Sequence, residues 1–268
     1  MNHDKSIQEA WRWIEDGPAS GGQNMTVDET LALSAEPLDP PILRVYAWDP
    51  PAISLGFHQP LGSIDLVRCE ADGIDVVKRP TGGRAVLHHE ELTYSVVIPS
   101  GHPLYRFSIP ELHRKIGLSL VQGIRLLGVP AELSRPSVDW ASHYRTAMAS
   151  GCFSATSKDE ITLDGRKLVG SAQRRYASAV LQHGSILIGD AHLRLPDYLA
   201  GLSENEKHEL GSKLREKTVS LSSRGCSTGP ETLTRALRSA FEETMGVRFQ
   251  SVNTEILNSA PAEAACRP

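Results

Sequence analysis

The segment Lys78-Arg-Pro-Thr-Gly-Gly-Arg-Ala-Val-Leu-His-His89 places a Gly82-Gly83 pair between two β-like runs, residues 74–78 and 84–87. Because glycine has no side chain, paired glycines let the backbone approach a ligand closely, and their N–H groups can face an acyl carbonyl or a phosphate. No Gly-Lys-Ser or Gly-Lys-Thr follows, which argues against a nucleotide-binding P-loop. The segment therefore predicts either a ligand-binding Gly-Gly loop or a plain hairpin with charged residues on its surface.

A second segment, Gly165-Arg-Lys-Leu-Val-Gly-Ser-Ala-Gln173, follows a strong turn signal. Asp164-Gly165, between the runs 161–163 and 167–172, is typical of a β-hairpin. Lys167 is then the first strand residue after the turn, over a floor of apolar and small side chains. A lysine held there could polarise a carbonyl or activate a neighbouring group. The alternative is a solvated lysine on the surface of a strand.

The chain has four cysteines, and their spacing matches neither a zinc site nor a CxxC redox pair. Cys152 lies in Ser150-Gly-Cys-Phe-Ser154, a stretch of small and polar residues that predicts a loop. A nearby cation favours the thiolate, which is the nucleophilic form of cysteine. Thioester exchange suits such a residue, because the acyl group stays activated toward an amine. The alternative is a buried and unreactive thiol.

A fourth segment, Gln182-His-Gly-Ser185, lies inside a predicted strand, residues 179–188. His183 could orient a substrate or the lysine. The alternative is a histidine that is fully hydrogen-bonded within the core.

The rest of the chain predicts helices and strands in irregular alternation. The clearest helix covers residues 110–128, where leucine and isoleucine recur three and four residues apart. Residues 17–22 read as a flexible connection, and Asn24 as the N-cap of a helix over residues 25–35. Other helices are expected at residues 204–217 and 231–245, and other strands at residues 11–14 and 92–98. Two further strands, residues 42–48 and 53–57, are expected on either side of an Asp49-Pro-Pro51 turn.

The predicted strands follow one another along the chain as in hairpins, with helices interspersed at irregular intervals. This order predicts an α+β fold with a mixed, mainly antiparallel sheet. We expect one catalytic domain over residues 1–250 and a frayed tail over residues 251–268. A net charge of −4 without a basic stripe argues against nucleic-acid binding. The chain contains no apolar run of about 18 residues, so no membrane span is expected. Residues 1–16 also lack the apolar core of a secretion signal. A cytoplasmic location is therefore expected.

Together these segments resemble the biotin/lipoate protein ligase superfamily, and most closely its branch of LipM-type octanoyl-[acyl carrier protein]:protein N-octanoyltransferases. The resemblance covers about residues 11–249 and includes, in order, residues 24–29, 51–56, 79–88, 92–95 and 167–173. The branch assignment depends on Cys152-Phe153, since superfamily ligases that activate lipoate with ATP need no cysteine. Lys78 and His89 depart from the family pattern, where an arginine and an aspartate are expected.

The resemblance implies an acyltransferase that moves octanoyl from octanoyl-acyl carrier protein to a lysine of a lipoyl domain or of the glycine cleavage H protein. It implies Cys152 as the nucleophile that forms a thioester, Lys167 as its activating partner, and no metal or other cofactor. An arginine group, Arg166 with Arg174 and Arg175, could help acidic partner proteins dock. The residues expected to bind substrate along an elongated acyl pocket are Arg79, Thr81, Gly82, Gly83, Arg84, His88, Gly170, Ser171, His183 and Gly184.

Three alternatives stay open on the sequence. An ATP-dependent lipoate–protein ligase would use Lys167 beside an acyl-adenylate, and Cys152 would be incidental. An amidotransferase would use the cysteine but take octanoyl from the H protein. A catalytically silent module would bind lipoate or an acylated protein without turnover.

Overall fold

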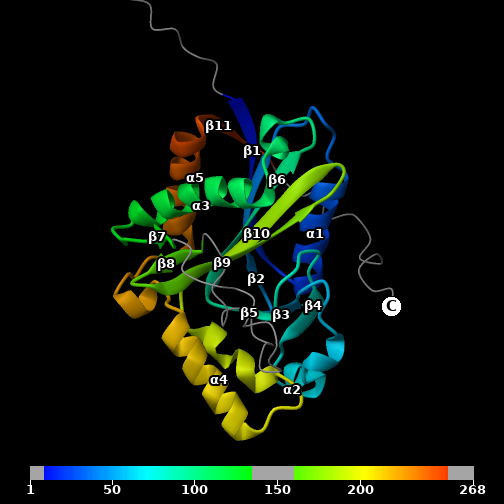
Figure 1. Cartoon of the computed structure of the whole chain (residues 1–268), viewed down its shortest axis with the longest axis vertical. Coiled ribbons are helices and arrows are strands. Elements are labelled where there is room, and N and C mark those ends of the chain that lie inside the picture. The colour runs from blue at the N-terminus through cyan, green and yellow to red at the C-terminus, as the bar shows by residue number, and fades with distance from the viewer. Residues whose placement is uncertain (1–8, 135–159, 253–268) are drawn as a thin grey trace, which may run out of the picture.

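A mixed β-sheet forms the centre of the molecule (Figure 1). The computed structural model describes residues 9–134 and 160–252. Within these ranges eight strands form the sheet in the order β11-β1-β2-β6-β10-β9-β8-β7. β1 is parallel to both of its neighbours, and the other pairs are antiparallel, which confirms the predicted fold class. The strands are β1 (Glu9–Ala19), β2 (Ile42–Trp48), β6 (Glu91–Pro99), β7 (Glu132–Leu133), β8 (Ile161–Leu163), β9 (Arg166–Arg175), β10 (Ala179–Leu187) and β11 (Val247–Ser251).

A second, three-stranded sheet carries the Gly82-Gly83 segment. Its central strand is β3 (Ala52–Leu55), which is parallel to β4 (Asp75–Lys78) and antiparallel to β5 (Val86–His88). The Gly-Gly segment therefore does not close a hairpin, because β4 and β5 lie on opposite sides of β3. The strands predicted at residues 42–48 and 53–57 are present as β2 and β3, but they belong to different sheets, so the turn between them does not join paired strands.

Helices cover both faces of the main sheet. On β10, Val180 and Ile186 pack in one hydrophobic core with α3 (Ile109–Arg125) and α5 (Pro230–Met245), whereas Ala179 and Leu181 pack in another with α1 (Gly21–Leu33). Because side chains alternate along a strand, these are opposite faces, and His183 shares the α1 side. The remaining helical segments of the described ranges are α2 (Leu66–Ala71), α4 (Glu204–Lys217) and the 3-10 turns Leu61–Ser63, Pro103–Arg106, Ala191–Tyr198 and Ser222–Arg224.

None of the helices in the described parts of the chain has the length and apolar character needed to cross a bilayer. The predicted helices at residues 110–128, 204–217 and 231–245 are confirmed as α3, α4 and α5.

The start of α1 differs from the sequence prediction. Ser20 caps the helix in a capping box with Gln23, so the helix begins at Gly21 rather than after Asn24. Asn24 is instead buried inside the helix and donates to the carbonyls of Ala19 and Ala47. β1 continues to Ala19, so residues 17–22 are not a flexible connection. Glycine is a poor helix former, so Gly21 and Gly22 argued against a helix start at this position in the sequence.

The β8–β9 hairpin is confirmed, and it positions Lys167. Asp164 and Gly165 both have a positive φ, 51° and 73°, as the predicted tight turn requires. Ile161 pairs with Val169 but Thr162 pairs with Lys167, so β9 accommodates one extra residue directly after Lys167. Bulges of this kind redirect neighbouring side chains and are common beside active sites.

Candidate active site

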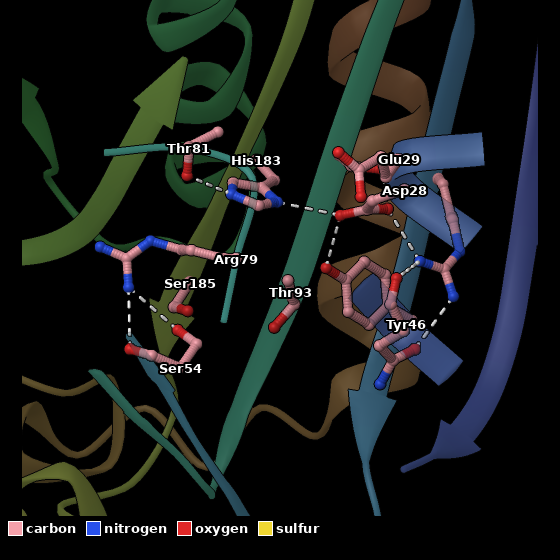
Figure 2. A network of polar contacts seen from close by, with 12 residues as sticks. Asp28, Glu29, Tyr46, Ser54, Arg79, Thr81, Thr93, His183 and Ser185 are labelled. Atoms are coloured by element: carbon pink, nitrogen blue, oxygen red, sulfur yellow. Dashed lines mark hydrogen bonds and ion pairs between the residues drawn. The ribbon is translucent and has the colours of Figure 1, made fainter. Parts of the chain in front are cut away.

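A chain of three buried side chains, Asp28, His183 and Thr81, links α1 and β10 to the Gly-Gly loop (Figure 2). Nδ1 of His183 lies 3.0 Å from Oδ2 of Asp28, and its Nε2 lies 2.7 Å from Oγ1 of Thr81. Because an ionised carboxylate can only accept, Nδ1 is a donor, and in the tautomer that carries its proton on Nδ1 the ring accepts at Nε2 from the Thr81 hydroxyl. His183 is thus fully hydrogen-bonded within the protein, and it fixes the residue that precedes Gly82.

Asp28 is the anchor of this chain. Its two oxygens also accept from Arg44 at 2.8 Å, from Ser95 at 2.8 Å and from Tyr46 at 2.8 Å. Burial alone raises the pKa of Asp28, but the His183 hydrogen bond and the charge of Arg44 outweigh it and hold the pKa below its ordinary value. The carboxylate is therefore charged and fully paired. In the sequence Asp28 lies in residues 24–29, one of the segments of the resemblance, but no role was predicted for it.

Arg79 holds the Gly-Gly loop from the other side. Its Nη1 donates to the backbone oxygen and hydroxyl of Ser54, at 2.9 and 3.0 Å. Its Nη2 donates to the carbonyls of Gly82 and Arg84, at 2.9 and 2.7 Å. Arg79 is buried, so these bonds fold the loop around its guanidinium group. Arg84 contributes its backbone carbonyl to this arrangement.

His88 belongs to a second buried network, which shares the Ser54 hydroxyl with Arg79. Its Nε2 lies 2.7 Å from Oγ of Ser54 and its Nδ1 lies 2.8 Å from Oε1 of Glu91. The ring stacks on Trp48, with 4.1 Å between the ring centroids. Ser185 also donates to Glu91, at 2.7 Å. Like His183, His88 therefore uses both ring nitrogens within the protein.

Two glycines allow close backbone packing at the site. A Cβ atom on Gly56 would lie 2.0 Å from the carbonyl oxygen of Gly83, so β3 and the Gly-Gly loop could not keep this contact with any side chain there. A Cβ atom on Gly184 would lie 2.4 Å from the carbonyl oxygen of Gly170. Gly170 itself pairs with Ser185 across β9 and β10.

Ser171 lies on the α3 side of the sheet. Its Oγ is 2.7 Å from the hydroxyl of Tyr94, which also accepts from Gln182 at 2.7 Å. Burial raises the pKa of Tyr94 to about 12. Ser171 contributes to a narrow pocket between α3 and the sheet; the other lining residues are His113, Gly117, Glu160, Ile161, Val169 and Gln182.

Lys167 is buried and ion-paired. Its Nζ lies 2.7 Å from Oε1 of Glu160, and the two side chains are only 7% and 4% exposed. The solvated alternative for Lys167 is therefore wrong. Glu160 was not predicted as a site residue from the sequence. Regular hairpin spacing does not give this pair, because the register shifts between Ile161, which pairs with Val169, and Thr162, which pairs with Lys167.

The structure does not bring all predicted residues together. Cys152 lies outside the described residues. Arg166 and Arg174 stand at opposite ends of β9, about 27 Å apart at the usual rise per strand residue, so the proposed arginine cluster is wrong. Arg174 instead donates to the carbonyl of Pro80 at 2.9 Å, with its guanidinium over the rings of Phe57 and Tyr176.

Comparison with known sequences gives one family. The family model described as lipoyl protein ligase A/B catalytic domain matches residues 20–242. A protein named octanoyltransferase LipM from Kyrpidia tusciae is 38% identical over 245 residues, which cover 90% of this chain and 89% of that protein. The protein of the same name from Moorella thermoacetica is 45% identical over 182 residues, which cover 67% of this chain and 66% of that protein.

Solved structures share the fold. A bipartite lipoate protein ligase from Thermoplasma acidophilum, described with its E2 lipoyl domain, superposes with a TM-score of 0.76 at 22% identity, covering 91% of this chain and 87% of that one. A lipoate-protein ligase A bound with ATP gives a TM-score of 0.73 at 23% identity, with 91% and 89% covered. At these identities the match establishes the architecture alone.

Proposed function

The chain belongs to the lipoyl protein ligase A/B catalytic-domain family and is an octanoyltransferase of protein lipoylation, and we propose that it carries the octanoyl group as a thioester on Cys152. In this proposal the donor is octanoyl-acyl carrier protein, and the acceptor is a lysine of a lipoyl domain or of the glycine cleavage H protein. The reaction takes place in the cytoplasm within a single catalytic domain, residues 1–250.

The first half-reaction is a thioester exchange. The Cys152 thiolate attacks the carbonyl carbon of the octanoyl group, and the bond from that carbon to the sulfur of the donor breaks. The donor sulfur leaves and takes up a proton as a thiol. Negative charge develops on the carbonyl oxygen in the transition state, and the Lys167 ammonium and backbone N–H groups of the Gly-Gly loop stabilise it.

The second half-reaction forms the amide. The uncharged amine of the acceptor lysine attacks the octanoyl thioester, the bond to Cys152 breaks, and the nitrogen loses a proton. Cys152 returns as a thiolate, and the kinetics are ping-pong. No phosphoryl group is consumed, because the thioester of the donor is already activated.

The buried ion pair of Lys167 carries the proposal. A lysine that is 7% exposed and held by a carboxylate is an oriented cation, and an oriented cation suits a developing oxyanion. Chain connectivity permits Cys152 to reach it. Cys152 precedes Glu160 by eight residues, which span at most about 29 Å when fully extended.

The formation of the thioester tests this function. We expect wild-type protein mixed with octanoyl-acyl carrier protein to gain one octanoyl mass, labile to hydroxylamine and located on the peptide that contains Cys152. Cys152→Ala gains none. Cys69 and Cys226 serve as controls, and their alanine variants keep the modification. Cys69 is a poor nucleophile, because burial raises the pKa of its thiol to about 11.

The same assay separates the competing donors. If Cys152→Ala transfers octanoyl at the wild-type rate, the thioester route is wrong. If octanoyl-H protein loads Cys152 and octanoyl-acyl carrier protein does not, the enzyme is an amidotransferase. If labelling of a lipoyl domain requires lipoate or octanoate with ATP, the chain acts as a ligase.

A further inference from the structure

The ion pair between Glu160 and Lys167 is more than a local contact, because both of its groups are taken out of water. An ammonium group buried without a counter-charge loses its proton or costs several kcal/mol of stability. Glu160 supplies that counter-charge at 2.7 Å from Nζ. Glu160 therefore gives the Lys167 ammonium a buried counter-charge.

The backbones of both partners are also fixed. The N–H of Glu160 donates to Oγ of Ser134 at 3.1 Å, and the N–H of Ser134 donates back to the carbonyl of Glu160 at 2.7 Å. The carbonyl of Lys167 accepts from Val219 at 3.0 Å. A lysine side chain normally has considerable rotamer freedom. Here its direction is set by a carboxylate whose own position is set by β7 and β8.

We propose that Glu160 is the positioning residue of Lys167: it holds the ammonium charged and aimed for the acyl-transfer step. This inference rests on the proposed function. Glu160 acts through Lys167, so its loss lowers the rate of the chemical step and leaves the KM for the donor protein nearly unchanged. A shorter carboxylate at this position keeps the charge and restores part of the rate.

Single-turnover acylation of Cys152 by octanoyl-acyl carrier protein tests the rate effect. A hydrogen bond to a charged group is worth enough to predict that Glu160→Gln lowers the acylation rate about ten- to a hundredfold. Glu160→Asp is expected to recover part of that loss. The matched control is Glu132→Gln on β7, an exposed carboxylate, which acylates at the wild-type rate. Thermal unfolding of each variant confirms that the compared proteins are folded.

A second readout does not involve octanoyl transfer. Amine-reactive reagents attack only the uncharged amine, so a charged and buried Lys167 reacts slowly. We expect trinitrobenzenesulfonate to label the Lys167 peptide several-fold faster in Glu160→Gln than in wild type, measured by peptide mass spectrometry. In Glu160→Asp the labelling stays close to the wild-type rate.

The outcomes distinguish this inference from the proposed function. Wild-type acylation and wild-type labelling in Glu160→Gln would overturn the role of Glu160 and leave the thioester route intact. If wild-type Cys152 gains no octanoyl, the proposed function fails, and the labelling experiment still decides whether Glu160 controls Lys167. If Glu160→Gln does not fold, Glu160→Asp decides: labelling of Lys167 several-fold faster than in wild type together with wild-type acylation contradicts the inference, whereas a partial loss of acylation with labelling close to wild type supports it.

Discussion

The polar side chains around the Gly-Gly loop make their hydrogen bonds to other groups of the protein. His183 and His88 each use both ring nitrogens, and Arg79 donates to Ser54 and to the loop carbonyls. Such groups shape a site by fixing its backbone. We therefore propose that substrate contacts at this loop fall to its backbone N–H groups, and that the side chains of Arg79 and His183 act by holding the loop in place.

Asp28→Asn should reveal the strength of this buried arrangement. Removing one partner of a buried ion pair leaves Arg44 undercompensated, so we expect a loss of about 3–5 kcal/mol in the free energy of unfolding at pH 7. The pKa of Asp28 in the folded chain is lowered from 3.8, so its contribution is complete above pH 3.8 and is lost as the pH falls through the lower, native value. The difference between the two proteins should therefore shrink at acidic pH, as urea unfolding at several pH values can measure.

The control for this measurement is Asp39→Asn. Asp39 pairs with Arg12 at the surface, where both side chains are at least 30% exposed, and such pairs contribute at most about 1 kcal/mol. An equal and small loss in both variants would contradict the role assigned to Asp28.

The sequence predicts which residues belong to the site better than it predicts their contacts. Thr81, His183 and Arg79 could be identified because they lie in recognisable segments. Their hydrogen bonds could not, since Thr81 and His183 are 102 residues apart in the chain. Glu160 was missed because its partner becomes clear only once the register of the hairpin is known.

At the scale of elements, the contact between the end of β3 and the Gly-Gly loop couples the small sheet to the site. Phe57 donates its N–H to the carbonyl of Thr81 at 2.9 Å, and Gly56 packs against the carbonyl of Gly83. A methyl group at residue 56 must displace the loop, because the atom it meets is backbone.

We therefore predict that Gly56→Ala slows octanoyl transfer at least about tenfold, the effect of misplacing a positioned group by a fraction of an ångström to an ångström. Gly62→Ala is the matched control in the same connection, since nothing lies within 4 Å of a Cβ atom there. Single-turnover acylation of both variants checks this. Equal rates in both would show that the loop does not need its present position.

Elements with local signals were predicted well. The apolar stripe of α3 and the Asp164-Gly165 turn are both decided by neighbouring residues, and both are confirmed. The pairing of β3 with β4 and β5 was missed, because the choice of a strand partner depends on residues far away in the chain. The start of α1 was missed because the glycine at position 21 is required by a distant contact and not by the helix. A Cβ atom there would lie 2.8 Å from Val77.

At the scale of the whole molecule, the main sheet separates two sets of functional groups. The Asp28–His183–Thr81 chain lies on the α1 side, and Ser171 with its narrow pocket lies on the α3 side. Ser134 and Glu160 are joined by two hydrogen bonds, so the segment with Cys152 begins and ends beside the partner of Lys167. Composition and strand order alone indicated only the α+β class; the resemblance of short segments supplied the family.

The central claim is that octanoyl on Cys152 is a true intermediate. The most direct measurement isolates octanoyl-enzyme, free of donor and of ATP, and mixes it with a lipoyl domain. We expect the octanoyl mass to leave Cys152 and to appear on the lipoyl lysine as an amide, at a rate no slower than steady-state turnover. Octanoyl that stays on Cys152, or a transfer that begins only when ATP is added, would contradict the central claim.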